Sequence, residues 1–196
     1  MFGDIGKYIR HCNLCKQYKR GNDRNRIDYE NIVSHAPFER ICLDICGPIK
    51  RSFEGHEYVL GIIDHFSKYC ALIPLKSISA KSIAKSLWES WISKYGAPIS
   101  ILTDNAKSFQ ADIFKTLTEL CHISHVFSPP YHQQANGLIE RLFGTVKPLI
   151  KIAREQYKED WNRGLTHIEM ALRSAPQSRT GFSPYEIVFG RKMRLP

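Results

Sequence analysis

The chain has 196 residues, which is enough for one full domain and a short extension. Its apolar content of 43% is ordinary for a globular core, no apolar run approaches the length of a membrane span, and the start does not resemble a signal peptide. These features predict a protein of the cytosol or nucleus with no membrane partner. The net charge of +9 favours a polyanionic partner such as nucleic acid, although a merely soluble basic protein would show the same charge.

The first 35 residues differ from the rest of the chain. Cys12 and Cys15 are separated by two residues, a gap typical of zinc knuckles. A tetrahedral zinc site needs four ligands, and no second pair of suitable residues follows at motif spacing. The pair therefore predicts half of a zinc site, and we do not expect this chain to bind zinc stoichiometrically. The basic stretch over residues 16–26 indicates a linker that is either solvated or in contact with phosphates.

From residue 36 onward, apolar runs and three- to four-residue periodicity predict a series of strands and helices. Three closely spaced strands come first and are expected to form an antiparallel meander, followed by helix, strand, helix, strand and then further helices. The expected strands are residues 41–46, 58–63, 69–75, 99–102 and 122–127. The expected helices are residues 80–92, 109–120, 133 to about 153 and about 158–175, with a short helix after the turn that begins at Thr180.

The helical stripes predict which side chains are buried. In the helix over residues 80–92, both Trp88 and Trp91 fall on the apolar stripe, so we expect both in the core. Pro148 lies inside the third helix and predicts a kink or a break near residues 144–148. The other residues expected on buried stripes are Ile113, Phe114, Leu117 and Leu120 in the second helix, and Leu138, Leu142, Val146, Leu149 and Ala153 in the third.

Three carboxylates are the candidate functional groups. Asp44 lies within the first predicted strand, Asp104 at the end of the fourth and Glu140 near the start of the third helix, with 59 and 35 residues between them. Alone, Glu140 would be only a favourable charge near a helix start. A buried carboxylate is costly unless it is paired or holds a cation. Three carboxylates brought together repel one another, and divalent cations such as Mg²⁺ or Mn²⁺ relieve that repulsion.

The sequence around these acids resembles the integrases of gypsy-class long-terminal-repeat retrotransposons, which belong to the retroviral integrase superfamily. Five motifs occur in the family's order and spacing, and the resemblance covers nearly the whole chain. The motifs are residues 43–48 (Leu43-Asp44-Ile45-Cys46-Gly47-Pro48), 63–69, 102–105, 128–132 and 136–141.

The resemblance implies a ribonuclease H-like α/β fold, a mixed five-stranded sheet with helices on both faces, as an integrase catalytic core over residues 36–196. It also implies that residues 1–35 are a remnant of the family's zinc-binding domain and a basic linker. In the family, two histidines upstream of the cysteine pair complete the zinc site, so Zn²⁺ is expected only in a longer chain. The family's C-terminal DNA- or chromatin-binding module is expected to lie outside these residues.

The resemblance implies a chemistry as well. Asp44, Asp104 and Glu140 would form the catalytic triad and hold two Mg²⁺ or Mn²⁺ ions, with Asp44 bridging both. The activity implied is DNA integration, in which the element's 3′ DNA ends are trimmed and then joined to target DNA by phosphoryl transfer. Paired cuts need two active sites, so we expect a dimer or larger homo-oligomer on double-stranded DNA, in the nucleus after passage through the cytoplasm. The residues expected to contact DNA are Asn105, Gln133, Asn136, Lys147 and Lys151.

Some positions leave alternatives open. Asp64 in the second strand is a rival metal ligand, although a structural role is favoured because the family's triad does not include its position. Ala106 stands where the family has glycine, and alanine would cost about 1 kcal/mol if this position needs a positive φ. Gln133 and Ala135 replace the family's usual proline and threonine, which affects the expected DNA contacts of this loop but not the acids.

Two other functions fit parts of the pattern. The first is a domesticated, catalytically silent integrase that serves as a DNA-binding or scaffold protein, and the intact acidic triad argues against it. The second is a ribonuclease H-type hydrolase, and the motif over residues 136–140 and the spacing of its glutamate argue against that.

Overall fold

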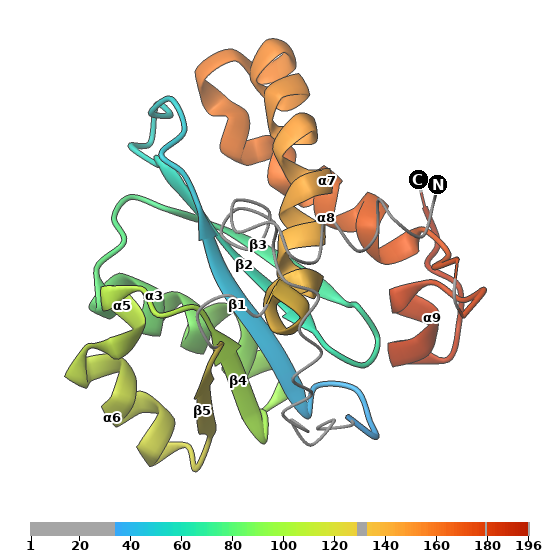
Figure 1. Ribbon diagram of the computed structural model, residues 1–196. Coiled ribbons are helices and arrows are strands. Elements are labelled where there is room, and N and C mark those ends of the chain that lie inside the picture. Colours follow the sequence, from blue (N-terminus) through green and yellow to red (C-terminus); the bar gives the residue numbers. More distant parts are fainter. Residues whose placement is uncertain (1–33, 129–132, 179, 196) are drawn as a thin grey trace, which may run out of the picture. The chain divides into compact units, whose positions relative to one another are not determined.

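A mixed five-stranded sheet forms the centre of the fold in the computed structural model, which describes residues 34–128, 133–178 and 180–195 (Figure 1). The strands are β1 (Arg40–Cys46), β2 (Tyr58–Asp64), β3 (Cys70–Leu75), β4 (Ser100–Thr103) and β5 (Ser124–Phe127). Their order across the sheet is β3-β2-β1-β4-β5. β1 and β2 pair antiparallel, as do β2 and β3, whereas β1–β4 and β4–β5 are parallel. The predicted meander and mixed sheet are confirmed, and β1 is the central strand.

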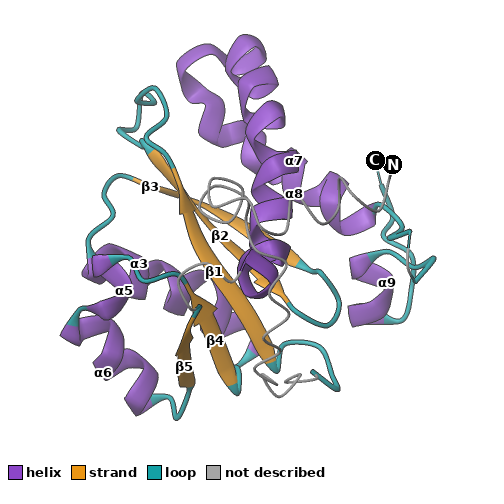
Figure 2. Ribbon diagram, in the orientation of Figure 1, coloured by secondary structure: helices purple, strands orange, loops and turns teal. Residues whose placement is uncertain are grey.

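Helices cover both faces of this sheet (Figures 1 and 2). Before β5 come α3 (Ala80–Leu87), the π-helix η1 (Trp88–Ile92), α4 (Ser93–Tyr95), α5 (Lys107–Gln110) and α6 (Asp112–Leu120). After β5 come α7 (Gln133–Tyr157), the 3₁₀ helix η2 (Lys158–Arg163), α8 (Gly164–Ser174) and α9 (Pro184–Phe189). Over the described residues, none of these helices has the length and apolarity that crossing a membrane requires.

The strands contribute alternate side chains to two apolar cores, one on each face of the sheet. Ile41 and Leu43 of β1 pack in the first core with residues of α3, η1 and α6. Cys42 and Cys46 of β1 pack in the second core with residues of α7 and α8. Because successive side chains of a strand point to opposite faces, Asp44 shares the face of Cys42 and Cys46. The carboxylate of Asp44 is therefore on the side of the sheet that α7 covers.

The prediction that both tryptophans are buried is wrong for Trp88. Trp91 is fully buried, but Trp88 is 49% exposed. The turn that carries both residues is a π-helix, in which an extra residue per turn changes the direction of the side chains. A stripe drawn with the regular helical period therefore misplaces Trp88.

Two predicted core residues of α6 are also exposed, namely Ile113 and Leu120. The residues that α6 buries are Phe114 and Thr118, which lie four positions apart on one line of the helix. A short helix at the rim of a domain buries only such a narrow line, so the apolar residues beside it face outward.

Of the kink or break predicted near residues 144–148, the break is wrong, because α7 is continuous from Gln133 to Tyr157, and the kink stays a prediction. A proline removes one backbone hydrogen bond, but tertiary packing on either side of it can hold a helix together. Val146 and Ile150 are both buried. The predicted stripe of α7 is correct at Leu142, Val146 and Ala153, but it omits three residues that are buried in the second core, Ile139, Phe143 and Ile150.

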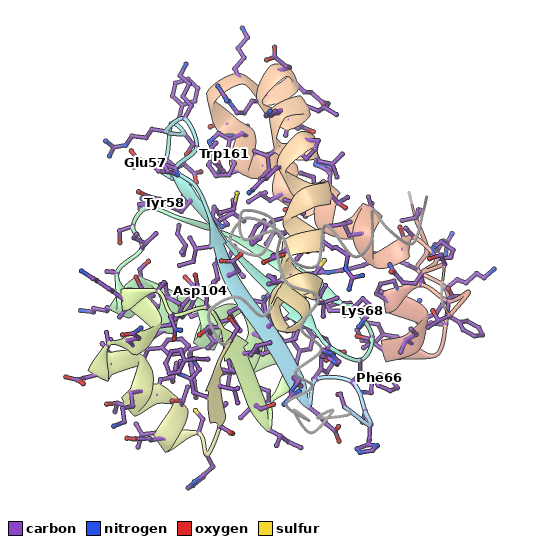
Figure 3. The ribbon with its side chains drawn as sticks, viewed as in Figure 1. Glu57, Tyr58, Phe66, Lys68, Asp104 and Trp161 are labelled. Atoms are coloured by element: carbon purple, nitrogen blue, oxygen red, sulfur yellow. The ribbon has the colours of Figure 1, made fainter. Side chains whose placement is uncertain are left out.

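The connection between β1 and β2 is held by the segment that follows α7. Trp161 of η2 is buried and donates a hydrogen bond from Nε1 to the carbonyl oxygen of Lys50 at 2.8 Å. Figure 3 labels Trp161, and also Glu57 and Tyr58, where this connection enters β2. The end of α7 is thereby fixed to the hairpin that begins just after Asp44.

Replacing Trp161 with phenylalanine should lower the free energy of unfolding by about 2–3 kcal/mol, because the buried indole loses its hydrogen bond to Lys50 and a cavity remains in the core. Urea denaturation measures the change. Trp88→Phe is the matched control: the same chemical change at a half-exposed site should alter stability by about 0.5 kcal/mol or less. Equal effects of the two substitutions would contradict the role given to Trp161.

Candidate active site

The parallel pairing of β1 with β4 brings the two aspartates together. Arg40 lies opposite Ser100, and Cys42 lies opposite Leu102. Continuing this register for two more residues brings Asp44 level with Asp104, which follows β4 directly. Figure 3 shows Asp104 at the end of β4, beside β1. The predicted neighbourhood of these two acids thus follows from the sheet itself.

Hydrogen bonds between side chains and the backbone fix the turn after Asp104. Its Oδ1 accepts a hydrogen bond from the backbone N–H of Ala106 at 3.1 Å. Ala106 has φ −61° and ψ 140°, an extended conformation open to any residue, so the alanine there carries no backbone cost. Asn105 is exposed, and its Nδ2 lies 3.5 Å from the carbonyl oxygen of Ser128, towards which it donates. The end of β4 and the end of β5 are thus joined beside Asp104.

Glu140 reaches this region from α7. The backbone of β2 places Gly61 opposite Asp44, and two residues of α7, Ile139 and Phe143, pack against Gly61. Both are buried, whereas Glu140 between them is exposed. The helix therefore crosses the sheet at the level of Asp44, and Glu140 is an exposed residue of the segment that crosses there.

The carboxyl group of Asp44 is electrostatically coupled to the other two acids. Burial is the largest cause, and together with the charges of Asp104 and Glu140 it raises the pKa of Asp44 to about 6, against a hydrogen bond from the Ile45 N–H at 2.7 Å and the charge of Lys147. Within the described part of the chain, that N–H is its only hydrogen-bond donor. A half-buried carboxylate with two like charges nearby is the electrostatic setting in which a divalent cation binds well.

The three acids do not yet form a closed metal site. Over residues 34–128 and the described part of 133–195, no three His, Cys, Asp or Glu side chains form a group that could hold a metal ion as they stand. Asp44 and Asp104 are brought together, and Glu140 stands on the adjoining helix. The donors are hard carboxylate oxygens, which fit Mg²⁺ or Mn²⁺. The assignment of Asp44, Asp104 and Glu140 as catalytic metal ligands stays a prediction.

Asp64, the rival ligand, has a structural role. It pairs with Ile41, whose side chain lies in the first core, so Asp64 points to the face opposite Asp44. It is fully buried, and its oxygens accept hydrogen bonds from the N–H of Phe38 at 3.0 Å and the N–H of Ser67 at 2.7 Å. These bonds hold the β2–β3 turn and the entry to β1.

The structure describes only part of the expected DNA- and zinc-binding residues. Lys147 and Lys151 are exposed on α7. The side chains of Gln133 and Asn136 lie outside the described residues, as do Ala135's side chain and both members of the zinc pair, Cys12 and Cys15. These assignments, and the division of the chain at residues 35 and 36, remain predictions.

The packing of α7 on Gly61 was not predicted. The stripe chosen from the sequence left out Ile139 and Phe143, the residues that make this contact. One signal was available: a glycine inside an apolar strand often marks a place where another segment approaches the backbone closely.

This chain belongs to the integrase core domain family, whose model matches residues 34–133. It is 33% identical over 162 residues to the retrovirus-related Pol polyprotein from transposon 412 of Drosophila melanogaster, a match that covers 83% of this chain and 13% of the polyprotein. It is 29% identical to the Gag-Pol polyprotein of Walleye dermal sarcoma virus, with 97% of this chain and 11% of the polyprotein covered. The chain thus spans only a small part of the length of these relatives.

Solved structures show the same fold. The HTLV-2 integrase catalytic core domain in complex with magnesium superimposes with a TM-score of 0.66 at 18% identity, covering 79% of this chain and 99% of that one. A simian T-cell lymphotropic virus intasome in complex with PP2A regulatory subunit B56 gamma gives a TM-score of 0.72 at 18% identity. The match covers 100% of this chain and 69% of that one. The predicted ribonuclease H-like fold of integrase cores is confirmed.

The raised pKa of Asp44 predicts a pH dependence of stability in the metal-free protein. The folded chain holds this proton up to about pH 6, whereas the unfolded chain releases it near its ordinary pKa of 3.8. The protonated carboxyl group therefore stabilises the folded chain fully at a pH below the pKa of the unfolded chain. This stabilisation is lost as the pH rises through the pKa of the folded chain. Relative to Asp44→Asn, the wild type should therefore lose stability between about pH 4 and about pH 6 and then level off. Urea denaturation in EDTA measures this, and a pH-independent difference between the two proteins would contradict it.

Proposed function

We propose that this chain is the catalytic core of a DNA integrase that trims the 3′ ends of an element's DNA and joins them to target DNA. The observation that carries the proposal is the placing of Asp44 level with Asp104 beneath a helix that presents Glu140. Membership of the integrase core domain family supports the same conclusion. The reaction class is phosphoryl transfer between DNA strands.

The three acids would hold two Mg²⁺ or Mn²⁺ ions, with Asp44 shared between them. When bound, such ions activate the attacking oxygen and stabilise the leaving oxygen. Lys147 and Lys151, exposed on α7, would bind the phosphates of double-stranded DNA and hold its backbone in position without reading its sequence. Asn105, Gln133 and Asn136 would orient the DNA strand beside the acids.

We further propose a nuclear site of action, with passage through the cytoplasm before import, because the target of joining is chromosomal DNA. Cys12 and Cys15 would bind Zn²⁺ only within a longer chain that supplies two more ligands. The net charge of +9 is consistent with a DNA partner.

A catalytically silent DNA-binding or scaffold protein is the second candidate. The observation that favours it is that the described residues contain no group of three His, Cys, Asp or Glu side chains that could hold a metal ion as they stand. The experiment below distinguishes the two candidates.

Glu140→Gln should lower the rate of strand transfer, measured with Mn²⁺ and a pre-cut oligonucleotide duplex, by a factor of about 10² or more. A catalytic metal supplies several kcal/mol of transition-state stabilisation, and the substitution removes one of its ligands. Because Glu140 is exposed, stability should change by about 0.5 kcal/mol or less. DNA affinity, measured by fluorescence anisotropy, should stay near the wild-type value.

Glu155→Gln is the matched control, since Glu155 is an exposed glutamate on the same helix. It should join DNA at the wild-type rate, and Asp104→Asn should behave as Glu140→Gln does. Joining at the wild-type rate by Glu140→Gln would refute its role. DNA binding without any joining by the wild-type chain would support the silent scaffold instead.

The working form should contain at least two chains, because two DNA strands must be cut and joined together. The HTLV-2 core is described in dimeric and trimeric forms. Analytical ultracentrifugation with labelled DNA ends should show two or more chains for each pair of ends. Concerted joining of two ends at full rate by a strictly monomeric species would contradict this expectation.

A further inference from the structure

β2 has a glycine at the level of Asp44. Gly61 pairs with Asp44 of β1 on one side and with Leu72 of β3 on the other. Its face is the one covered by α7, because Val59 and Ile63, two positions away in each direction, both lie in the second core. Opposite residues of an antiparallel pair have Cβ positions about 4.5–5.5 Å apart. The space left by the missing side chain therefore lies directly beside the Asp44 side chain.

Phe143 of α7 fills that space. A Cβ atom at Gly61 would lie 2.6 Å from Cζ and 3.0 Å from Cε2 of Phe143, and 3.4 Å from Cδ1 of Ile139. Carbon atoms pack without strain at about 3.5–4.0 Å. Phe143 is only 3% exposed and is packed within the second core, so its ring has little room to move aside. A methyl group at Gly61 would therefore push α7 away from the sheet.

Glu140 lies between these two contacts. It follows Ile139 directly and precedes Phe143 by three residues, which is less than one helical turn. We propose that Gly61 is a positioning residue of the active site: by admitting Phe143 into the surface of the sheet, it sets the depth of α7 and the distance from Glu140 to Asp44. The inference rests on the proposed function, in which these two acids act together. Gly61 itself touches neither DNA nor metal.

Gly164 provides a matched control for a purely structural effect. A Cβ atom there would lie 2.6 Å from Cβ of Ala153, as close as the contact at Gly61. Ala153 lies about 20 Å along α7 from Glu140, from a rise of 1.5 Å per residue. Gly164→Ala should therefore crowd α7 to a similar degree without moving Glu140.

The experiment compares Gly61→Ala, Gly164→Ala and the double variant Gly61→Ala/Phe143→Leu in the full chain. Gly61→Ala should lower kcat for strand transfer with Mn²⁺ about 100-fold, a loss that a 1 Å misplacement of a catalytic group can cause. Its KM for DNA should stay within about threefold of the wild type, and its affinity for Mn²⁺ without DNA should fall. Gly164→Ala should lower the thermal midpoint to a similar degree and keep kcat within about threefold.

The double variant tests whether the clash with Phe143 causes the loss of kcat in Gly61→Ala. Leucine ends at its Cδ atoms and lacks the Cε2 and Cζ atoms that would meet the new methyl group. Gly61→Ala/Phe143→Leu should therefore recover kcat by about tenfold or more over Gly61→Ala. This variant also keeps the test valid if Gly61→Ala alone folds poorly. Wild-type kcat in Gly61→Ala, an equal loss in Gly164→Ala, or no recovery in the double variant would overturn the inference.

Failure of the proposed function has a different signature, namely a wild-type chain that neither binds Mn²⁺ nor joins DNA. In that case the positioning claim is tested on metal-free crystals of the wild type and Gly61→Ala. The Cα atom of Glu140 should lie about 1 Å farther from that of Asp44 in the variant, the shift needed to restore normal carbon contacts. An unchanged separation would overturn the inference.

Discussion

The parallel pairing of β1 with β4 is the contact on which the candidate site depends. It joins two segments that are far apart in the chain, with β2, β3 and α3 between them. Closing so long a connection costs conformational entropy, and burial on both faces of the sheet offsets that cost. Ile101 of β4 packs in the first core and Leu102 packs against the second, which fixes the strand's register. A slip of one residue would exchange these faces and move Asp104 out of level with Asp44.

The same pairing places the carboxyl group of Asp44 in a half-buried position near like charges, which costs electrostatic free energy. Asp44 lies half-buried, and both burial and the neighbouring acids raise the pKa of its carboxyl group. The charge of Lys147 opposes that shift. A neutral residue at this position would suit the metal-free fold better, which agrees with the catalytic role proposed for Asp44. Asp64 shows the contrast: it is buried more completely, but hydrogen bonds from Phe38 and Ser67 satisfy it.

Sequence reasoning was sufficient for the order of elements and for the neighbourhood of the two aspartates. The first three strands are mostly apolar runs of six or seven residues, and Asp44 and Asp104 occupy positions that a mixed sheet with a central first strand brings together. The fine placement of helical side chains was not predictable in the same way. The π-turn at Trp88 and the continuity of α7 through Pro148 are both decided by tertiary contacts rather than by local propensity.

The prediction of which face of α7 packs on the sheet was partly wrong for a related reason. The predicted stripe and the real one overlap at Leu142 and Val146, but the real one extends to Ile139 and Phe143 because the sheet offers a hollow at Gly61. Hydrophobic periodicity reports how apolar a face is, and says nothing of the shape of the surface that it meets. A glycine and a phenylalanine 82 positions apart fit together only once both elements are folded.

The three acids differ in how firmly they are held, and this explains why the depth of α7 matters. Asp44 is fixed by the pairing of its strand with Gly61 of β2, and Asp104 by the hydrogen bond that its Oδ1 accepts from the Ala106 N–H. Glu140 is exposed, and its side chain has rotamers to choose from at a cost of less than about 2 kcal/mol. Among the three acids, Glu140 is therefore the one whose side chain has the most freedom to change its direction. A rotation can bring its oxygens to the aspartates only if the helix backbone already lies close enough, and the contact of Phe143 with Gly61 is what determines that distance.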